Sequence, residues 1–359
     1  MMKVGFDAKR YFNNRTGLGN YSRSVVDALL TYAPDNQYVL FAPDQEGKTL
    51  PSGLMVAESR GKGSLWRMLG MRNDLIRNAI EVYHGLSNEI PVGLAGSGIK
   101  TVVTIHDLIF RRYPNYYRAA DRFIYNIKTN YACRYSDVII AASQTTAADI
   151  KRFCKVDESR IRVVYQPVDN VWYQKPKATV TVFTEPYILY VSSFTQRKNH
   201  GSLIEAFAKI HKQTDMKLVL AGAAGETLEK CRAFVNHEKL NDRVHFYVDC
   251  DFLTLHSLVY NSALVVNCSF FEGFGIPLAE AAVCGRPMAV SGIPVFKEIA
   301  GNAARYFNPN DTDDLAAVMM ESLSSEYQST MEEGRRFLLD KIHPAAIAGQ
   351  INSIYQSLA

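Results

Sequence analysis

The feature that most constrains the fold is a repeated alternation between short apolar segments and longer amphipathic ones. Segments with strand character occupy residues 3–7, 37–42, 100–105 and 137–142, and a helical pattern at 20–32 follows the first of them. Strands that alternate with helices in this way are typical of a parallel sheet with helices on both faces. We therefore expect an α/β fold.

The alternation pauses at 162–170 and then begins again, which indicates two domains. Pro167 and the polar residues after it are typical of a linker. A chain of 359 residues also has the length expected for two domains. We predict Rossmann-like domains at 1–167 and 168–342, with a last helix at 343–359 that packs back on the first domain.

The charge is unevenly distributed between the two halves. Residues 1–170 carry an excess of seven positive charges, whereas residues 171–359 carry an excess of three negative ones. A basic N-terminal half favours an anionic partner such as a membrane surface, a lipid phosphate or a nucleic acid. A solvated basic face without any partner explains the same charge nearly as well.

The sequence shows neither a membrane span nor a secretion signal. No apolar run approaches the roughly 20 residues that a spanning helix needs, and Asp7 interrupts the first apolar stretch. We therefore expect the protein to remain in the cytoplasm. The six cysteines include no Cys-x-x-Cys pair, so free thiols are favoured over disulfides or a zinc site.

Two loops of the second domain are expected to leave the carboxyl ends of strands, the edge at which open α/β sheets bind ligands. They span residues 192–199 and 268–280. In the first loop, Arg197 and Lys198 would supply positive charge for a phosphate. An isolated Arg-Lys pair is usually solvated, but here both loops fall at the same edge.

The second loop combines two glycines with two carboxylates. Gly273 and Gly275 allow a ligand to approach the backbone closely, and Pro277 begins a helix whose N-terminus attracts anions. Glu272 and Glu280 suit a ligand with hydroxyl groups on both sides of a diphosphate. A nucleotide sugar has this layout, whereas a tight turn without any ligand is the structural alternative.

The same region resembles a large enzyme family. Residues 272–280, Glu-Gly-Phe-Gly-Ile-Pro-Leu-Ala-Glu, with 285–287 and 291–294, are similar to the GT4 family of retaining glycosyltransferases. Residues 197–199 and 203–207 resemble the phosphate-binding loop and helix of that family. The resemblance covers nearly the whole chain and implies the GT-B fold, two Rossmann-like domains whose parallel sheets face each other across a cleft.

The resemblance implies a role for each residue of the second loop. Glu272 would contact the donor sugar together with the backbone N–H groups of Phe274 and Gly275. Gly273 would let the donor approach the backbone, and Glu280 would hold the ribose.

In the first loop, the resemblance implies that Lys198, together with Arg197, clamps the diphosphate. The sequence departs from the family in one respect. Many relatives have Gly-Arg directly after the first strand of this domain, whereas this chain has Ser192 and Ser193. Arg197 would take over the missing charge.

The N-terminal half matches the family as well. Residues 17–21, Gly-Leu-Gly-Asn-Tyr, resemble its glycine-rich loop, which would place Gly17 and Gly19 near the phosphates and the acceptor. His106 ends a strand and matches a histidine that faces the donor sugar. A satisfied structural histidine is the alternative for His106 and, more strongly, for His84.

The resemblance also implies retention of configuration without a metal or another cofactor. No Asp-x-Asp stands in a loop typical of metal sites, and Asp249 and Asp251 are better explained by helix capping. Catalysis would consist mainly of positioning the substrates and stabilising the charge of the leaving diphosphate. Closure of the domains would exclude water.

We interpret the chain as a hexosyltransferase that acts on a saccharide or lipid-linked saccharide acceptor in surface-polysaccharide assembly. The runs at 272–277 and 293–299 look most like mannosyltransferases, so GDP-mannose is the first donor to consider and a UDP-sugar the second. Residues 63–72 combine apolar bulk with arginines and are a candidate for membrane contact, or equally a buried helix with exposed arginines.

Other classes stay open. The spacing of the two glutamates argues against a GT-B epimerase or phosphorylase, and the lack of Gly-x-Gly-x-x-Gly at a strand end argues against a nicotinamide dehydrogenase. A non-catalytic sugar or nucleotide binder fits the N-terminal charge. Nucleic acid is not an expected partner, because Glu272 and Glu280 would be out of place on such a surface.

Overall fold

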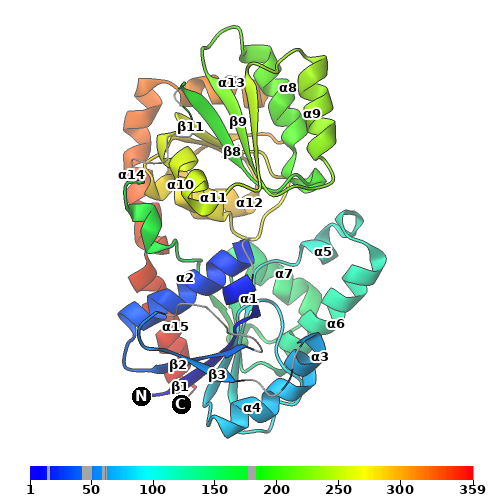
Figure 1. Ribbon diagram of the computed structural model, residues 1–359, viewed down its shortest axis with the longest axis vertical. Coiled ribbons are helices and arrows are strands. Elements are labelled where there is room, and N and C mark those ends of the chain that lie inside the picture. The colour runs from blue at the N-terminus through cyan, green and yellow to red at the C-terminus, as the bar shows by residue number, and fades with distance from the viewer. Residues whose placement is uncertain are drawn as a thin grey trace. The chain divides into compact units, whose positions relative to one another are not determined.

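The computed structural model describes residues 1–13, 17–42, 51–58, 61, 63–176, 183 and 185–358. The chain divides into two compact units. Unit 1 consists of Met1–Asp169 with Lys341–Ala359, and unit 2 consists of Asn170–Asp340. Each unit has its own parallel sheet and covering helices, so the α/β architecture predicted from the alternation is confirmed (Figure 1).

Unit 1 is built on a parallel sheet. Its strands are β1 (Lys3–Asp7), β2 (Gln37–Ala42), β3 (Leu54–Glu58), β4 (Val82–Gly85), β5 (Lys100–Ile105), β6 (Val138–Ala141) and β7 (Ile161–Val163). Its helices are α1 (Lys9–Asn13), α2 (Gly17–Tyr32), α3 (Gly63–Leu65), α4 (Met71–Arg77), α5 (Ile109–Arg112), α6 (Ala119–Tyr135), α7 (Gln144–Cys154) and α15 (Pro344–Gln356). The strand order is β3-β2-β1-β4-β5-β6-β7. It reverses between β1 and β4, so the unit is doubly wound.

Helices cover both faces of this sheet, and the strand residues alternate between two apolar cores. On one face, Val4 and Phe6 pack with residues of α2 and α15. On the other face, Val39 and Phe41 pack with residues of α4 and α7. Because both faces are buried, the strands are apolar along most of their length, which explains their short apolar runs in the sequence.

The last helix of the chain completes the first of these cores. Ile347, Ile351 and Tyr355 of α15 are buried in the same cluster as Phe6, and the helix packs on α2. The Tyr355 hydroxyl also lies 2.6 Å from Nδ1 of the buried His84 on β4. The C-terminal helix therefore belongs structurally to unit 1.

Unit 2 is built in the same way. Its strands are β8 (Tyr187–Val191), β9 (Lys217–Gly222), β10 (Val244–Val248), β11 (Leu264–Asn267), β12 (Met288–Ser291) and β13 (Arg305–Phe307). Its helices are α8 (His200–Ile210), α9 (Leu228–His237), α10 (Phe252–Asn261), α11 (Ile276–Val283), α12 (Pro294–Ala300), α13 (Thr312–Ser322) and most of α14 (Ser325–Ile342). The strand order β10-β9-β8-β11-β12-β13 reverses between β8 and β11.

Three short elements of unit 1 do not follow from the sequence pattern. α1 lies in a polar stretch that favours a loop, β3 shows no clear period, and β7 begins the stretch interpreted as the linker. Each has only three to five residues, too few to show a helical or strand period. The strands form because each pairs with a longer neighbour, β3 with β2 and β7 with β6.

The segment 63–72, considered above for membrane contact, has a buried centre. Trp66 Nε1 donates to Oδ2 of Asp74 at 2.7 Å, and the buried Arg67 forms ion pairs with Asp7 and Glu89. This arginine is therefore part of the interior of unit 1. Among the described residues, no helix combines the length and the apolar character that crossing a membrane requires.

Candidate donor-binding site

The two loops predicted to bind the donor leave neighbouring strands of unit 2. The loop 192–199 follows β8 and the loop 268–275 follows β11, and these strands pair in parallel with Leu189 opposite Val265. The two strands also flank the point at which the strand order reverses. Open α/β sheets bind ligands there, because the connections from adjacent strands diverge to opposite faces.

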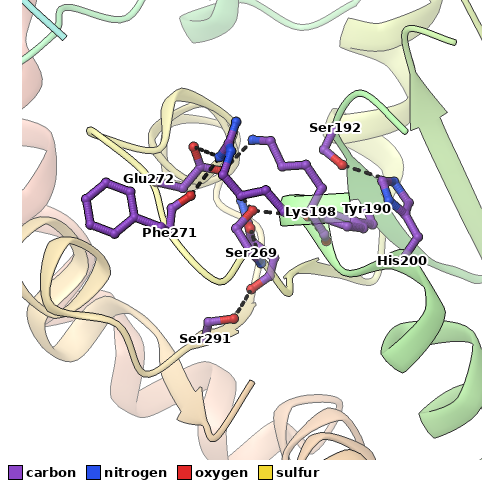
Figure 2. A network of polar contacts seen from close by, with 10 residues as sticks. Tyr190, Ser192, Lys198, His200, Ser269, Phe271, Glu272 and Ser291 are labelled. Atoms are coloured by element: carbon purple, nitrogen blue, oxygen red, sulfur yellow. Dashed lines mark hydrogen bonds and ion pairs between the residues drawn. The ribbon is translucent and has the colours of Figure 1, made fainter. Parts of the chain in front are cut away.

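Three charged side chains, which we call the charge cluster, connect the two loops (Figure 2). Nη1 of Arg197 donates to Oε2 of Glu272 at 3.0 Å and to the backbone oxygen of Phe271 at 2.6 Å. Nζ of Lys198 forms an ion pair with Oε1 of Glu272. The Ser269 hydroxyl donates to the same Oε1 at 2.7 Å. Both oxygen atoms of the carboxylate are therefore bound, by groups from both loops.

The electrostatics of the charge cluster keep Glu272 ionised. Burial alone would raise the pKa of this carboxyl, because only 9 % of the residue is exposed. The charges of Lys198 and Arg197, with the hydrogen bonds from Lys198 and Ser269, outweigh burial and lower its pKa to about 2. Two cations and one carboxylate leave one excess positive charge, which suits an anionic group.

Backbone contacts fix the two cations in place. The buried Tyr190 on β8 donates its hydroxyl proton to the backbone oxygen of Lys198 at 2.7 Å, and this hydroxyl lies 3.2 Å from that of Ser269. The N–H of Phe270 donates to the backbone oxygen of Arg197 at 3.0 Å. The sequence analysis missed Tyr190 and Ser269, since a tyrosine inside an apolar strand is indistinguishable from a core residue.

Asn199 ends the first loop in a left-handed conformation with φ of 56°. Its residue type is typical of a helix N-cap, but its side chain makes no cap hydrogen bond to α8. Instead, Oδ1 accepts a hydrogen bond from the Ser202 hydroxyl at 2.8 Å, and Nδ2 donates to the backbone oxygen of Pro309 at 3.0 Å. Asparagine suits this position because it tolerates the left-handed region better than most residues.

The second loop reaches α11 through Gly275. Its φ of 105° lies in the region that favours glycine, and a Cβ at this position would lie 2.7 Å from Cε1 of Phe296. Gly273 and Phe274 are buried beside it. Glu280, the second acid of the motif, is buried within α11 with 4 % of the residue exposed.

A buried histidine lies behind the first loop. Nε2 of His200 is 3.0 Å from the Ser192 hydroxyl, and its ring stacks on Phe194 with centroids 4.4 Å apart. Burial and the nearby Lys198 lower the pKa of His200 to about 3, so the ring is neutral at pH 7. Ser192, which stands where many relatives have glycine, orients this histidine. No pattern in the sequence indicated this contact.

In unit 1, His106 has partners for both ring nitrogens. Nε2 donates to the backbone oxygen of Leu86 at 2.8 Å, so Nδ1 accepts from the Gln166 amide at 3.0 Å. Burial lowers the pKa of His106 to about 4, although the bond to Leu86 partly opposes this. The imidazole is therefore neutral and satisfied within unit 1, and its contact with a donor sugar stays a prediction.

The predicted glycine-rich loop forms the first turn of α2. Gly17 is exposed and Gly19 is buried. Tyr21, two residues further on, lies edge-on to His106 with ring centroids 4.6 Å apart, and its hydroxyl is 3.0 Å from that of Thr104. The structure thus brings the predicted residues together in two groups, the charge cluster in unit 2 and His106 with the start of α2 in unit 1.

The helix-cap interpretation of the Asp-x-Asp segment is confirmed for Asp251. Its Oδ1 accepts a hydrogen bond from the N–H of Thr254 at 2.9 Å, at the start of α10. Within the part of the chain that the structure describes, no group of three His, Cys, Asp or Glu side chains is placed to hold a metal ion.

Models of two glycosyltransferase domains match the chain one after the other. The model described as glycosyltransferase family 4 matches residues 25–171, and the model described as glycosyl transferases group 1 matches residues 174–337. The first match lies in unit 1 apart from its last two residues, and the second lies in unit 2.

Proteins with similar sequences include mannosyltransferases. The O-antigen chain mannosyltransferase B of Escherichia coli is 25 % identical over 353 residues, which cover 90 % of this chain and 91 % of the relative. The O-antigen chain mannosyltransferase RfbU of Salmonella typhimurium is 29 % identical over 210 residues, which cover 58 % of this chain and 57 % of the relative. The chain therefore spans most of the first relative and little more than half of the second.

Solved structures share the fold over the whole chain. Sucrose-phosphate synthase from Thermosynechococcus elongatus has a TM-score of 0.80 at 18 % identity and covers 100 % of this chain and 99 % of its own. Anabaena HepE in complex with UDP and glucose has a TM-score of 0.75 at 18 % identity and covers 99 % of this chain and 100 % of its own. With both domain models matched in sequence and the fold shared throughout, the chain belongs to the GT4-type glycosyltransferases with the GT-B fold.

Proposed function

We propose that the chain is a retaining hexosyltransferase that moves mannose from GDP-mannose to a saccharide or lipid-linked saccharide acceptor, on the cytoplasmic side of a membrane, in surface-polysaccharide assembly. The observation that carries the proposal is the charge cluster at the reversal of strand order in unit 2. It holds two cations beside two buried glutamates, Glu272 and Glu280. This combination suits a diphosphate between two sets of hydroxyl groups.

A bound donor would rearrange the charge cluster. The diphosphate would replace Glu272 as the partner of Lys198 and Arg197, since two phosphates carry more negative charge than one carboxylate. The released Glu272 would then accept hydrogen bonds from hydroxyl groups of the donor sugar, and Glu280 from the ribose. As the bond to the sugar breaks, the two cations would stabilise the negative charge that develops on the leaving diphosphate.

The relatives support mannose as the sugar. Besides the two proteins above, an MMP alpha-(1->4)-mannosyltransferase of Mycolicibacterium hassiacum is 25 % identical over 223 residues. The second candidate is a UDP-sugar, which the structural similarity to HepE in complex with UDP and glucose favours. Both donors share the diphosphate, so the proposed roles of Lys198 and Arg197 are the same for either.

Donor turnover tests the proposal directly. The purified chain is incubated separately with GDP-mannose and UDP-glucose, with and without an α-mannoside acceptor, and the released nucleotide is measured. We expect GDP release to rise when the acceptor is added, and proton NMR of the product to show an α-linked mannose. Release of UDP alone would replace the donor, a β-linked product would exclude retention, and no release from either donor with any saccharide acceptor would exclude transferase activity.

We place the proposed membrane contact on α6. Phe123, Ile124 and Ile127 are exposed by 67, 48 and 51 %, and Arg118 is exposed just before the helix. Exposed apolar residues beside arginines suit a surface of anionic lipids.

A vesicle assay tests this contact separately from the transferase activity. Vesicles of phosphatidylglycerol should sediment the parent chain but not the Phe123→Asp variant. Leu253→Asp, which changes an equally apolar exposed residue of α10 in unit 2, should still bind. A parent chain that stays in the supernatant would exclude the membrane contact and leave the proposed transfer reaction untouched.

A further inference from the structure

Two cysteines from different helices of unit 1 meet in the interior. Cys133 lies in the last turn of α6 and Cys154 is the last residue of α7. Their side chains are hydrogen-bonded to each other. Cys133 is buried, with 1 % of the residue exposed, whereas Cys154 is only partly buried. One thiol of the pair is thus open to small molecules and the other waits behind it.

An arginine fixes the charge environment of the exposed thiol. Nη1 of Arg111, on α5, lies 3.3 Å from Sγ of Cys154 and also donates to the backbone oxygen of Phe153 at 2.9 Å. Further hydrogen bonds of this guanidinium to Asn126 and Asn130 hold it in place. A cation at this distance stabilises a thiolate, the reactive form of cysteine.

The two thiols are therefore unequal. The hydrogen bond from Cys133 and the charge of Arg111 lower the pKa of Cys154, although burial opposes them. Donation to Cys154 and burial raise the pKa of Cys133. Burial also raises the pKa of the remaining cysteines, all of which lie in the described part of the chain: Cys231, Cys250, Cys268 and Cys284.

Small molecules can reach the pair from one side. An open cavity of about 570 Å³ is lined by Arg111 and Phe153, the residues that adjoin Cys154, together with Arg122 and Phe123 of α6. Hydrogen peroxide is small enough to enter it, and the two arginines give it a cationic wall.

We propose that Cys133 and Cys154 form an oxidisable dithiol site that hydrogen peroxide converts to a disulfide. The Cys154 thiolate attacks one oxygen of the peroxide, the O–O bond breaks, and a sulfenic acid and hydroxide form. The sulfur of Cys133 then attacks the sulfur of Cys154. The S–S bond forms as the S–O bond breaks, and the departing hydroxide takes the Cys133 proton and leaves as water. Peroxide is reduced, two thiols are oxidised, and the ends of α6 and α7 become linked.

Mass spectrometry tests the site on the full-length chain. After treatment with a small excess of peroxide, we expect a peptide pair joined through Cys133 and Cys154. Titration of the unfolded chain should find two thiols fewer than the six of the reduced protein. The Cys133→Ser variant should instead accumulate a sulfenic acid on Cys154, which dimedone traps. Cys231→Ser, a control at a cysteine outside the pair, should form the disulfide as the parent does.

A second measurement needs no variant. In the reduced parent chain, iodoacetamide should modify Cys154 about tenfold faster than the partly buried Cys250, because a stabilised thiolate reacts faster than a thiol. The site is overturned if peroxide joins other cysteines or none. It is also overturned if Cys154 reacts no faster than Cys250, or if a folded Cys133→Ser chain gives no adduct at Cys154.

Discussion

Glu272 keeps two like charges close together before any ligand is present. Lys198 and Arg197 are adjacent in sequence and both point to the same carboxylate (Figure 2). Without Glu272, the two cations would repel each other in a partly buried site where screening by water is weak. The acid that would bind the sugar therefore also preorganises the cations that would bind the diphosphate, and the same residue serves both states.

The depressed pKa of Glu272 predicts a dependence of stability on pH. The folded pKa of about 2 lies below the ordinary value of 4.5. The contribution of this ion pair is thus complete above about pH 4.5 and is lost as the pH falls towards 2. Between pH 7 and pH 3, the difference in unfolding free energy between the parent and Glu272→Gln should shrink by about 2 kcal/mol.

Urea unfolding followed by Trp172 fluorescence measures this difference in unit 2, in a Trp66→Phe background that removes the second of the two tryptophans. Glu229→Gln is the control, because that side chain is 79 % exposed. Its difference from the parent should stay constant with pH. A constant difference for Glu272→Gln as well would contradict the pKa and the geometry on which it depends.

At this scale, the sequence predicted which residues would be neighbours but not how they would bind one another. The positions of Lys198 and Glu272 after two strands placed them at one sheet edge, because parallel strands end on the same side. Their direct ion pair depends on side-chain conformation, which no spacing encodes. Gln166, a partner of His106, was not found because it lies in the stretch interpreted as a linker.

Among the elements, α11 sets the geometry of the second loop. Its first residues follow Gly275, whose positive φ turns the chain from the loop into the helix. Phe296, on α12, fills the space where a side chain would stand. The glycine is thus required twice, once for the backbone conformation and once for the packing of two helices.

Gly275→Ala is therefore expected to destabilise unit 2 by about 2 kcal/mol or more, since the methyl group would combine overpacking against Phe296 with a strained φ. Gly201→Ala is the matched control. Gly201 lies in α8, and a Cβ there would meet nothing within 4 Å, so this change should be neutral or slightly stabilising. Urea unfolding of both variants checks the pair, and equal effects would show that the second loop tolerates a side chain at 275.

The elements themselves could be predicted where their period was long enough to be seen. The strands β8 and β11 stand out because four or five buried residues follow one another. In contrast, β7 has three residues and forms by pairing with β6. Such an edge strand is determined by its neighbour in the sheet, and therefore by residues distant in the sequence.

The molecule as a whole repeats one architecture twice. In each unit the strand order reverses once, between β1 and β4 in unit 1 and between β8 and β11 in unit 2. The alternation of strands and helices predicted both sheets because the strands are buried on both faces. The charge cluster lies at the reversal in unit 2, so the fold alone explains why loops distant in sequence supply it.

For the whole enzyme, we predict transfer without a metal ion. Lys198 and Arg197 would supply the positive charge that a divalent cation otherwise brings to a leaving diphosphate. Initial rates with GDP-mannose should therefore be equal in EDTA and in magnesium chloride at matched ionic strength. A rate that collapses in EDTA and returns with magnesium would show that the two side chains do not suffice.

The central claim is that the charge cluster of unit 2 binds the diphosphate of a nucleotide, and thermal unfolding in the presence of nucleotides tests it most directly. GDP, UDP, ADP and dTDP are each added to the parent, to Lys198→Ala and to Glu280→Ala. The control Lys209→Ala removes a lysine of α8 that pairs with the exposed Asp313. A ligand at about 100 times its dissociation constant stabilises a protein by about 2.7 kcal/mol, enough for a clear shift in melting temperature.

We predict that GDP stabilises the parent and the Lys209→Ala control, and that Lys198→Ala and Glu280→Ala lose most of this shift. Stabilisation by UDP in place of GDP would keep the site and change the donor. If no nucleotide stabilises the parent, or if Lys198→Ala responds as the parent does, the charge cluster is not the donor site and the account is wrong.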